Sequence, residues 1–350
     1  MVNDLFLLAL AALSVWVLSW GFRTLPQERW QIAAAVPIAK NDAGQWQGLN
    51  LTYYGVFHAG AYAAGVTMML VLLGAVGVPL PGTVTMVVLL LTCCVPASRL
   101  VARLVERKAA TFTVGGAVFV GLLVGPWILV WANHTLGPLL GFEIPVTAGL
   151  AAAAIGYALG EGAGRLACVS FGCCYGKPVS GISPRFRRLF ERYSFVFTGQ
   201  TKKVAYEGGL EGEKVVPVQA ITAVLFVVTA LLAAEVFLRG QHRTSLGLAL
   251  LVTQGWRVVS ETLRADHRGG GRVSAYQVMA VLAIVYLLAA LPFLPTGPGR
   301  QADIVAGLRV LWDPWVILFL QGLCLAIFLH TGRSVVTAAT LSFHVRRDRI

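Results

Sequence analysis

The chain has 350 residues, of which 57% are hydrophobic and only 13% are charged, and its mean hydropathy is +0.73. A water-soluble surface cannot be built from this composition, so soluble globular proteins are excluded and an integral membrane protein is predicted. The 28 Lys and Arg residues against 16 Asp and Glu residues give a net charge of +12. In a membrane protein this excess favours loops that face anionic lipid headgroups, and no nucleic acid partner is expected.

Nine apolar stretches follow one another along the chain, each close to the roughly 20 residues that a helix needs to span a bilayer. The first has no basic residue before it and no small-residue cleavage site after it, so we interpret it as a retained helix. The sequence therefore predicts an all-α polytopic membrane protein with about 8–9 transmembrane helices in one bundle. The nine stretches are residues 4–22, 52–75, 82–105, 112–133, 144–166, 216–238, 244–264, 274–294 and 314–332.

The longest polar interval, residues 167–215, separates the fifth and sixth stretches and is rich in Arg and Lys. We expect it to form a small polar cap over one membrane face. In the nine-helix arrangement 23 basic residues fall on the side of this cap and four fall on the other side. Because translocation of Lys and Arg is disfavoured, the count predicts an external N-terminus and a cytoplasmic cap.

Three charged residues lie at the end of the seventh apolar stretch. Arg257, Glu261 and Arg264 recur at i, i+4 and i+7, so they share one face of a helix. Burial of an ionised group in a bilayer is costly unless it is paired or faces water, which predicts that they point into the bundle at a functional site. The alternative is that Glu261 only neutralises two arginines at the interface, with Arg264 extending to the headgroups.

A glycine-rich run at the end of the fifth stretch, residues 160–178, holds five glycines around Arg165. Such a run can bring backbone N–H groups, the guanidinium and thiols to one surface, which suits a phosphate group. Glycines of this kind also serve the packing of membrane helices, so composition alone leaves both interpretations open.

Several short motifs follow one another in a defined order. The run Gly162-Ala163-Gly164-Arg165-Leu166 precedes two further glycines, Gly172 and Gly176. The other motifs are Tyr53-Tyr54-Gly55, Arg99, Gly115-Gly116, Pro217-Val218-Gln219 and Arg257-x3-Glu261-x2-Arg264. Together they resemble the prolipoprotein diacylglyceryl transferase family over roughly residues 48–294.

The resemblance implies transfer of a diacylglyceryl group from phosphatidylglycerol to a thiol acceptor, typically a prolipoprotein cysteine, with glycerol phosphate leaving. Arg165 with Arg257 or Arg264 would clamp the phosphate, and Glu261 would orient an arginine or accept a proton. The predicted catalytic residues are therefore Arg165, Arg257 and Glu261. The predicted substrate-binding residues are Arg264, Arg99, Tyr54, Gly164, Gly172, Gly176, Gln219, Cys168 and Cys173.

The chain also departs from the pattern of the family it resembles. Val114 stands where the family has a His before the double glycine, Cys168 where it has an Asn, and Ile221-Thr222 where it has Tyr-Glu. We expect a seven-helix core at residues 48–295, with an extra helix and linker at 1–47 and an extra helix and basic tail at 296–350. The added first helix reverses the expected orientation of the core, whereas typical family members work on the extracytoplasmic face.

Other functions remain open alongside the transferase. They are a lipid- or anion-binding transporter, a homologue acting on another acceptor at the cytoplasmic face, and a scaffold without activity. The chain's own Cys173 or Cys174 is a further candidate nucleophile. The six histidines are scattered without ligand spacing, so no metal and no cofactor are expected. The expected location is the cell (inner) membrane, with membrane phospholipid as the partner.

Overall fold

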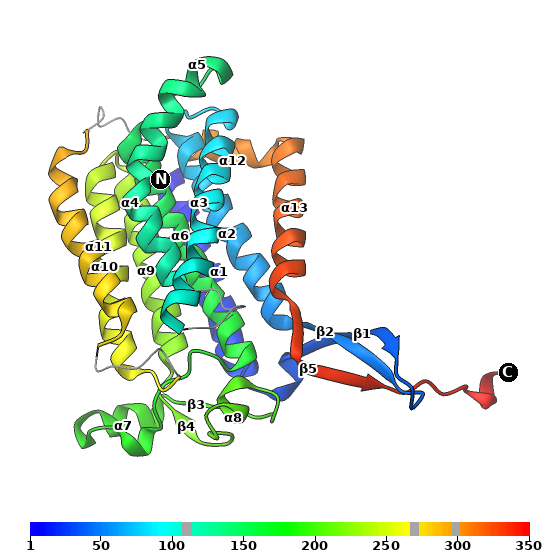
Figure 1. The fold of residues 1–350 in the computed structure, drawn as a ribbon. Helices are drawn as coiled ribbons and strands as arrows, with labels where there is room; N and C mark the ends of the chain where they lie inside the picture. The colour runs from blue at the N-terminus through cyan, green and yellow to red at the C-terminus, as the bar shows by residue number, and fades with distance from the viewer. Residues whose placement is uncertain (107–113, 267–272, 296–301) are drawn as a thin grey trace.

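Long apolar helices run in alternating directions through the molecule (Figure 1). The computed structural model describes residues 1–106, 114–266, 273–295 and 302–350. Within these residues eight helices are long and apolar enough to span a membrane. They are α1 (Val2–Thr24), α2 (Tyr53–Ala75), α3 (Leu80–Glu106), α4 (Val114–Thr135), α6 (Val146–Phe171), α9 (Val218–Leu238), α11 (Ala275–Ala290), which the 3-10 turn after it extends to Phe293, and α13 (Pro314–Thr331). The prediction of an all-α polytopic membrane protein is confirmed.

Helix α10 (His242–Leu263) is as long as the others but less apolar, because it carries several charged residues. It packs between α9 and α11 and also contacts α6 (Figure 1). Its neighbours thus make it a ninth helix of the bundle. The bounds of all nine helices lie within a few residues of the predicted stretches, since an apolar run of this length forms a helix to satisfy its backbone groups in lipid.

Helices α2 and α6 cross at very close range through their glycines. A Cβ atom on Gly65 would lie 2.6 Å from the carbonyl oxygen of Gly156, and one on Gly156 would lie 2.5 Å from that of Gly65. On another face of α6, a Cβ on Gly162 would lie 3.1 Å from the carbonyl oxygen of Ala223 in α9. Small residues at such crossings let membrane helices approach closely. This packing fixes α6 between α2 and α9.

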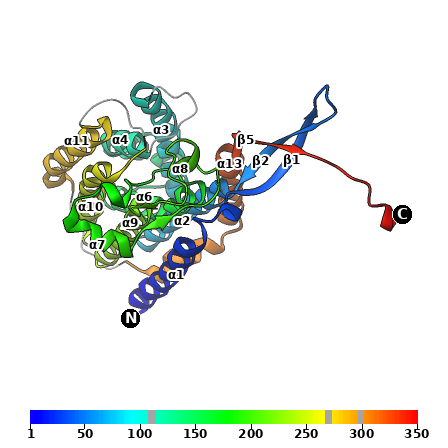
Figure 2. The same ribbon diagram turned by 90° about the horizontal axis from the view of Figure 1, so that it is seen from below.

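A three-stranded antiparallel sheet was not anticipated from the sequence. Strands β1 (Ile32–Lys40) and β2 (Trp46–Thr52) form a hairpin, and β5 (Arg333–Leu341) pairs with β2, giving the order β1-β2-β5. The sheet extends sideways from one end of the bundle (Figures 1 and 2). It therefore joins the segment after α1 to the segment after α13.

The polar interval after α6 folds into a small cap, as expected. It contains η2 (Val179–Gly181), α7 (Pro184–Arg192), β3 (Phe195–Val196), α8 (Lys203–Tyr206) and β4 (Lys214–Val215), with β3 and β4 paired. Two hydrogen bonds between Gln31 and Thr201 tie the cap to the N-terminal segment. The buried Lys202 donates from Nζ to the carbonyl oxygens of Leu25 (3.1 Å) and Ser170 (2.6 Å).

The cap and the sheet lie at the same end of the bundle, which we call the cap face (Figure 1). The opposite end carries the N-terminus and four shorter elements: α5 (Gly137–Leu140), η3 (Leu291–Phe293), α12 (Ile304–Arg309) and η4 (Val310–Trp312). Two 3-10 turns, η1 (Glu28–Trp30) and η5 (Arg347–Arg349), lie towards the cap face. Of the basic residues counted on the two sides of the membrane, five lie outside the described residues: Arg107, Lys108, Arg268, Arg272 and Arg300. The cytoplasmic position of the cap stays a prediction.

Candidate functional site

A cavity of about 1080 Å³ runs through the bundle between α2, α3, α4 and α6. Its middle is lined by apolar side chains such as those of Met69, Leu90, Leu122 and Leu150. Its volume lies at the upper limit of about 300–1,000 Å³ that is usual for small-molecule sites. A cavity of this volume with apolar walls suits a ligand with long apolar chains better than a compact polar one.

Positive charge collects at the cap end of this cavity. Among the described residues that line it, seven are basic and two are acidic. The basic residues are Arg99, Arg103, Arg165, Lys203, Arg257, Arg264 and Arg333, and the acidic residues are Glu161 and Asp266. The excess makes this end attractive to an anion, because opposite charges interact strongly where little water is present.

Glu161 holds two of the predicted arginines together. Arg257 donates from Nη2 to both carboxylate oxygens of Glu161, at 3.0 and 2.8 Å, and Arg165 donates to Oε1. Arg257 also donates to the Tyr157 hydroxyl at 3.2 Å. The side chain of Glu161 is only 3% exposed. Arg257 therefore takes its carboxylate from α6 and not from Glu261 on its own helix.

The helical repeat explains how these groups meet. Tyr157, Glu161 and Arg165 recur at i, i+4 and i+8, so they form one stripe of α6 facing α10 and the cavity. Arg257 reaches this stripe from α10. In the described part of the chain, the Nε atoms of Arg165 and Arg257 are buried and have no hydrogen-bond partner. A buried donor without a partner is costly, so both guanidinium groups retain capacity for an acceptor such as phosphate.

Arg264 and Glu261 form a second part of the site at the end of α10. Arg264 binds Asp266 through Nε (2.7 Å) and Nη2 (2.6 Å), and its Nη1 lies 3.7 Å from Glu261 Oε1. The Ser274 hydroxyl donates to Glu261 at 3.2 Å. Arg165, Arg257, Glu261 and Arg264 surround one small hollow, so the structure brings the four charged residues together, although Glu261 does not line the main cavity.

Five other predicted binding residues line the main cavity without taking part in these ion pairs. Arg99 donates from Nη2 to His330 Nε2 at 2.7 Å. Tyr54 packs against the rings of His58 and Phe171. The other three are Gly164, Cys168 and Cys173.

The remaining predicted residues shape the wall and do not line the main cavity. Gly172 ends α6 with a positive φ of 71°. A Cβ atom on Gly176 would lie 2.3 Å from the carbonyl oxygen of Val216, so this contact requires glycine. Gln219 lines the small hollow and donates from Nε2 to the carbonyl oxygen of Cys173 at 2.9 Å. The turn that follows α6 is thus held from several sides.

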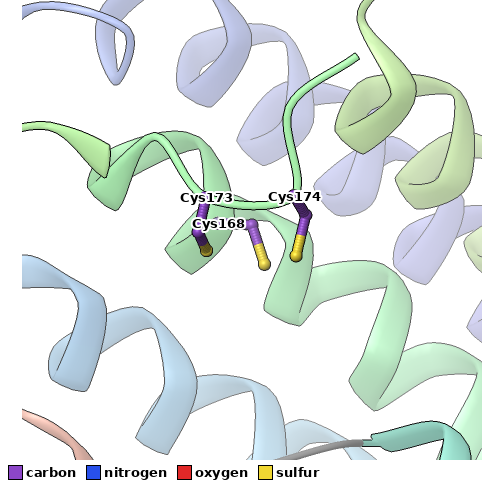
Figure 3. A group of neighbouring side chains, drawn as sticks. All are labelled: Cys168, Cys173 and Cys174. Carbon is purple, nitrogen blue, oxygen red and sulfur yellow. The ribbon is translucent and has the colours of Figure 1, made fainter. Parts of the chain in front are cut away.

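Three thiols meet at this turn (Figure 3). Cys168 lies in the last turns of α6, and Cys173 and Cys174 come directly after Gly172, which caps this helix. Their Sγ atoms all lie within 4.8 Å of one another. Cys168 and Cys173 belong to the predicted set, but the three-thiol cluster that they form with Cys174 was not predicted.

Sequence reasoning missed Glu161 and Tyr157 as members of the site. The signal was present, because Glu161 is an acidic residue inside an apolar stretch and stands four residues before Arg165. An ionisable residue in a membrane span indicates function by default, with its partner on the same helical face.

Comparison with protein families gives one result that bears on this geometry. The family model described as prolipoprotein diacylglyceryl transferase matches residues 43–293. No match was found among curated proteins. The matched residues include α2 to α11 and therefore the charged residues of the site: Glu161, Arg165, Arg257, Glu261 and Arg264. Val114 and Cys168, two of the positions that depart from the motif pattern, both line the cavity.

Proposed function

The chain belongs to the prolipoprotein diacylglyceryl transferase family, a family of transferases, and from this premise we propose which groups it transfers. The donor is an anionic phospholipid such as phosphatidylglycerol, the group transferred is diacylglyceryl, and the acceptor is a thiol, classically that of a prolipoprotein. The protein acts as a multi-pass protein of the cell (inner) membrane.

The observation that carries this proposal is the polarity of the cavity along its length. Apolar side chains line the part within the bundle, and seven basic residues lie among the described lining residues, most of them towards the cap end. A phospholipid has the same polarity, with acyl chains at one end and a phosphate at the other. The acyl chains would lie against the apolar wall while the phosphate lies among the arginines.

Arg165 and Arg257 would stabilise the charge that develops on the leaving phosphate. Glu161 holds both guanidinium groups in fixed positions, and each Nε remains available to an acceptor. Donors that are already oriented need no reorganisation during the reaction, which is the largest single contribution in many enzymes. Arg264, held by Asp266, would contact the headgroup from the other side of the hollow.

Release of glycerol phosphate from labelled phosphatidylglycerol tests the proposal. Purified protein with a cysteine-containing acceptor peptide should release glycerol phosphate and form a lipidated peptide. Arg165→Ala should abolish the release. Arg239→Ala is the matched control, since Arg239 is exposed at the opposite face, where it pairs with Glu235 at the end of α9. Movement of intact lipid between vesicles without any release would instead identify a transporter.

A further inference from the structure

Cys168, Cys173 and Cys174 form a cluster that the transfer reaction, as described so far, does not use. Their Sγ atoms lie within 4.8 Å of one another, and all three residues line the main cavity (Figure 3). We propose that this cluster binds Zn²⁺ through three thiolates and leaves a fourth coordination position open to the cavity for the acceptor thiol. The role of the bound thiol rests on the proposed transferase function; the metal site does not.

The positions of the three sulfurs suit zinc. Zn–S bonds are about 2.3 Å long in tetrahedral sites, which places bound sulfurs about 3.8 Å apart. Separations within 4.8 Å therefore need only a small inward movement of each thiol. Thiolate ligands bind Zn²⁺ in preference to Mg²⁺ or Ca²⁺. Three protein ligands with one open position are the arrangement of catalytic zinc, whereas structural zinc has four.

The backbone around the cluster is held in an unusual conformation. Cys174 has a φ of 56°, which non-glycine residues rarely adopt, and no other described non-glycine residue has a positive φ. This conformation turns the Cys174 side chain back towards Cys168 (Figure 3). The side-chain amide of Gln219 donates a hydrogen bond to the backbone carbonyl of Cys173, the residue before Cys174. Hydrogen bonds from residues that do not bind the metal themselves orient metal ligands in this way. Strained backbone persists where the surrounding structure holds it, often at functional sites.

The charges around the cluster favour an anionic metal complex. Zn²⁺ with three thiolates carries one negative charge, and binding of a fourth thiolate raises this to two. Arg165 interacts electrostatically with Cys168 and Cys174, and Lys203 interacts with Cys173 and Cys174. Arg264 also interacts with Cys174. These cations offset the cost of burying several thiolates in one place.

The open position gives the metal a defined part in the transfer. A thiol that binds Zn²⁺ loses its proton to solvent and becomes a thiolate. Its sulfur attacks the diacylglyceryl carbon that is bonded to the phosphate oxygen, so a C–S bond forms and the C–O bond breaks. The electron pair of the broken C–O bond stays on that oxygen, which leaves as part of glycerol phosphate. The zinc remains Zn²⁺ throughout. The thioether product is a poorer ligand and departs. Zinc would thus replace the proton-accepting His in whose position Val114 stands.

Metal content and sulfur coordination test the site without any lipid. The purified full-length protein should bind one Zn²⁺ per chain, and zinc X-ray absorption should give three sulfur ligands at about 2.3 Å. Addition of N-acetylcysteine amide should raise the number of sulfur ligands to four, and the matching alcohol, N-acetylserine amide, should not. A first coordination shell of nitrogen and oxygen, or no bound zinc after loading, would overturn the proposal.

Variants then locate the metal. Cys168→Ser, Cys173→Ser and Cys174→Ser should each weaken Zn²⁺ binding by at least about 100-fold. Mutation of a residue that only hydrogen-bonds to a metal ligand already lowers metal affinity by about 10- to 100-fold. Cys94→Ser is the matched control, since Cys94 lines the same cavity on α3 and should leave binding unchanged. A disulfide or a lipid adduct on two of the three cysteines, found by mass spectrometry of the purified protein, would overturn the metal site.

A further comparison separates this proposal from the transferase itself. Undiminished glycerol phosphate release by zinc-free protein would overturn the part assigned to the metal in the transfer. Absence of release both with and without zinc, in a protein that still gives three sulfur ligands, would count against the transferase and leave the metal site standing.

Discussion

Replacement of Glu161 by Gln removes a carboxylate that neutralises both Arg165 and Arg257. The side chains of these arginines are only 13% and 11% exposed, and that of Glu161 is 3% exposed. Removal of one partner from a buried ion pair leaves an uncompensated charge and costs about 3–5 kcal/mol. Glu161→Gln should therefore lower the free energy of unfolding by about this amount, a large part of the roughly 5–15 kcal/mol available to a typical protein.

The chain contains a matched control for this change. Glu235 and Arg239 have the same i, i+4 spacing at the end of another long helix, but their side chains are 25% and 66% exposed. An exposed pair contributes about 0.2–1 kcal/mol, so Glu235→Gln should be nearly neutral. The difference of at least about 2 kcal/mol between the two variants tests burial and not merely the loss of an ion pair.

Unfolding of the purified protein in mixed micelles measures both free energies. A double-mutant cycle of Glu161→Gln with Arg257→Gln should show strong coupling, since the second change removes one of the charges left unpaired. Equal losses for Glu161→Gln and Glu235→Gln, or additive effects in the cycle, would refute the assignment of Glu161 as the counter-ion of both arginines.

Three further outcomes follow from the site and the cap. Arg257→Lys should fail to restore the transfer activity that Arg257→Ala abolishes, because an ammonium cannot make a planar two-point phosphate contact; a fully active Lys variant would indicate simple charge balance. An added cysteine at Arg185 in α7 should resist a membrane-impermeant thiol reagent in intact cells while one at Arg239 reacts, and the reverse pattern would place the cap outside. Burial lowers the pKa of Lys202 from 10.5 to about 8, so the unfolded chain binds more protons between these values. Stability should rise from about pH 8 to 10.5, and Lys202→Met, assayed by thermal unfolding, should lack this rise.

The membrane helices could be predicted well because one physical requirement determines them. An apolar run in lipid must satisfy its own backbone, so hydropathy alone places the nine helices. Helix α10 is the instructive case: its charges lower its hydropathy, yet the same charges identify it as part of a site.

The partners within the site could not be derived in the same way. Arg257 and Glu261 share a helical face, and spacing alone suggests that they interact. The packing of α6 against α10 instead brings Glu161 to Arg257. Helical spacing encodes neighbours within one helix, whereas neighbours across two helices depend on where small residues permit close approach, as Gly162 does between α6 and α9.

The thiol cluster and the sheet depend on backbone turns and long-range pairing. Cys168 and Cys174 meet because Gly172 reverses the chain after α6. Strand β2 pairs with β5 from the far end of the sequence, and no local pattern in residues 46–52 specifies that partner.

This pairing sets an order on the biosynthesis of the protein. The β1–β2 hairpin emerges early, but the outer edge of β2 gains its partner only when residues 333–341 have been made. Thr52, at the start of α2, accordingly binds the carbonyl oxygen of Gly332 through both its N–H (2.8 Å) and its hydroxyl (2.9 Å). His330, Arg333 and Ser334 also line the cavity, so its wall is completed by residues that are synthesised after the rest of its lining. A nascent chain thus has Arg165 and Arg257 in place before the wall of its main cavity is complete.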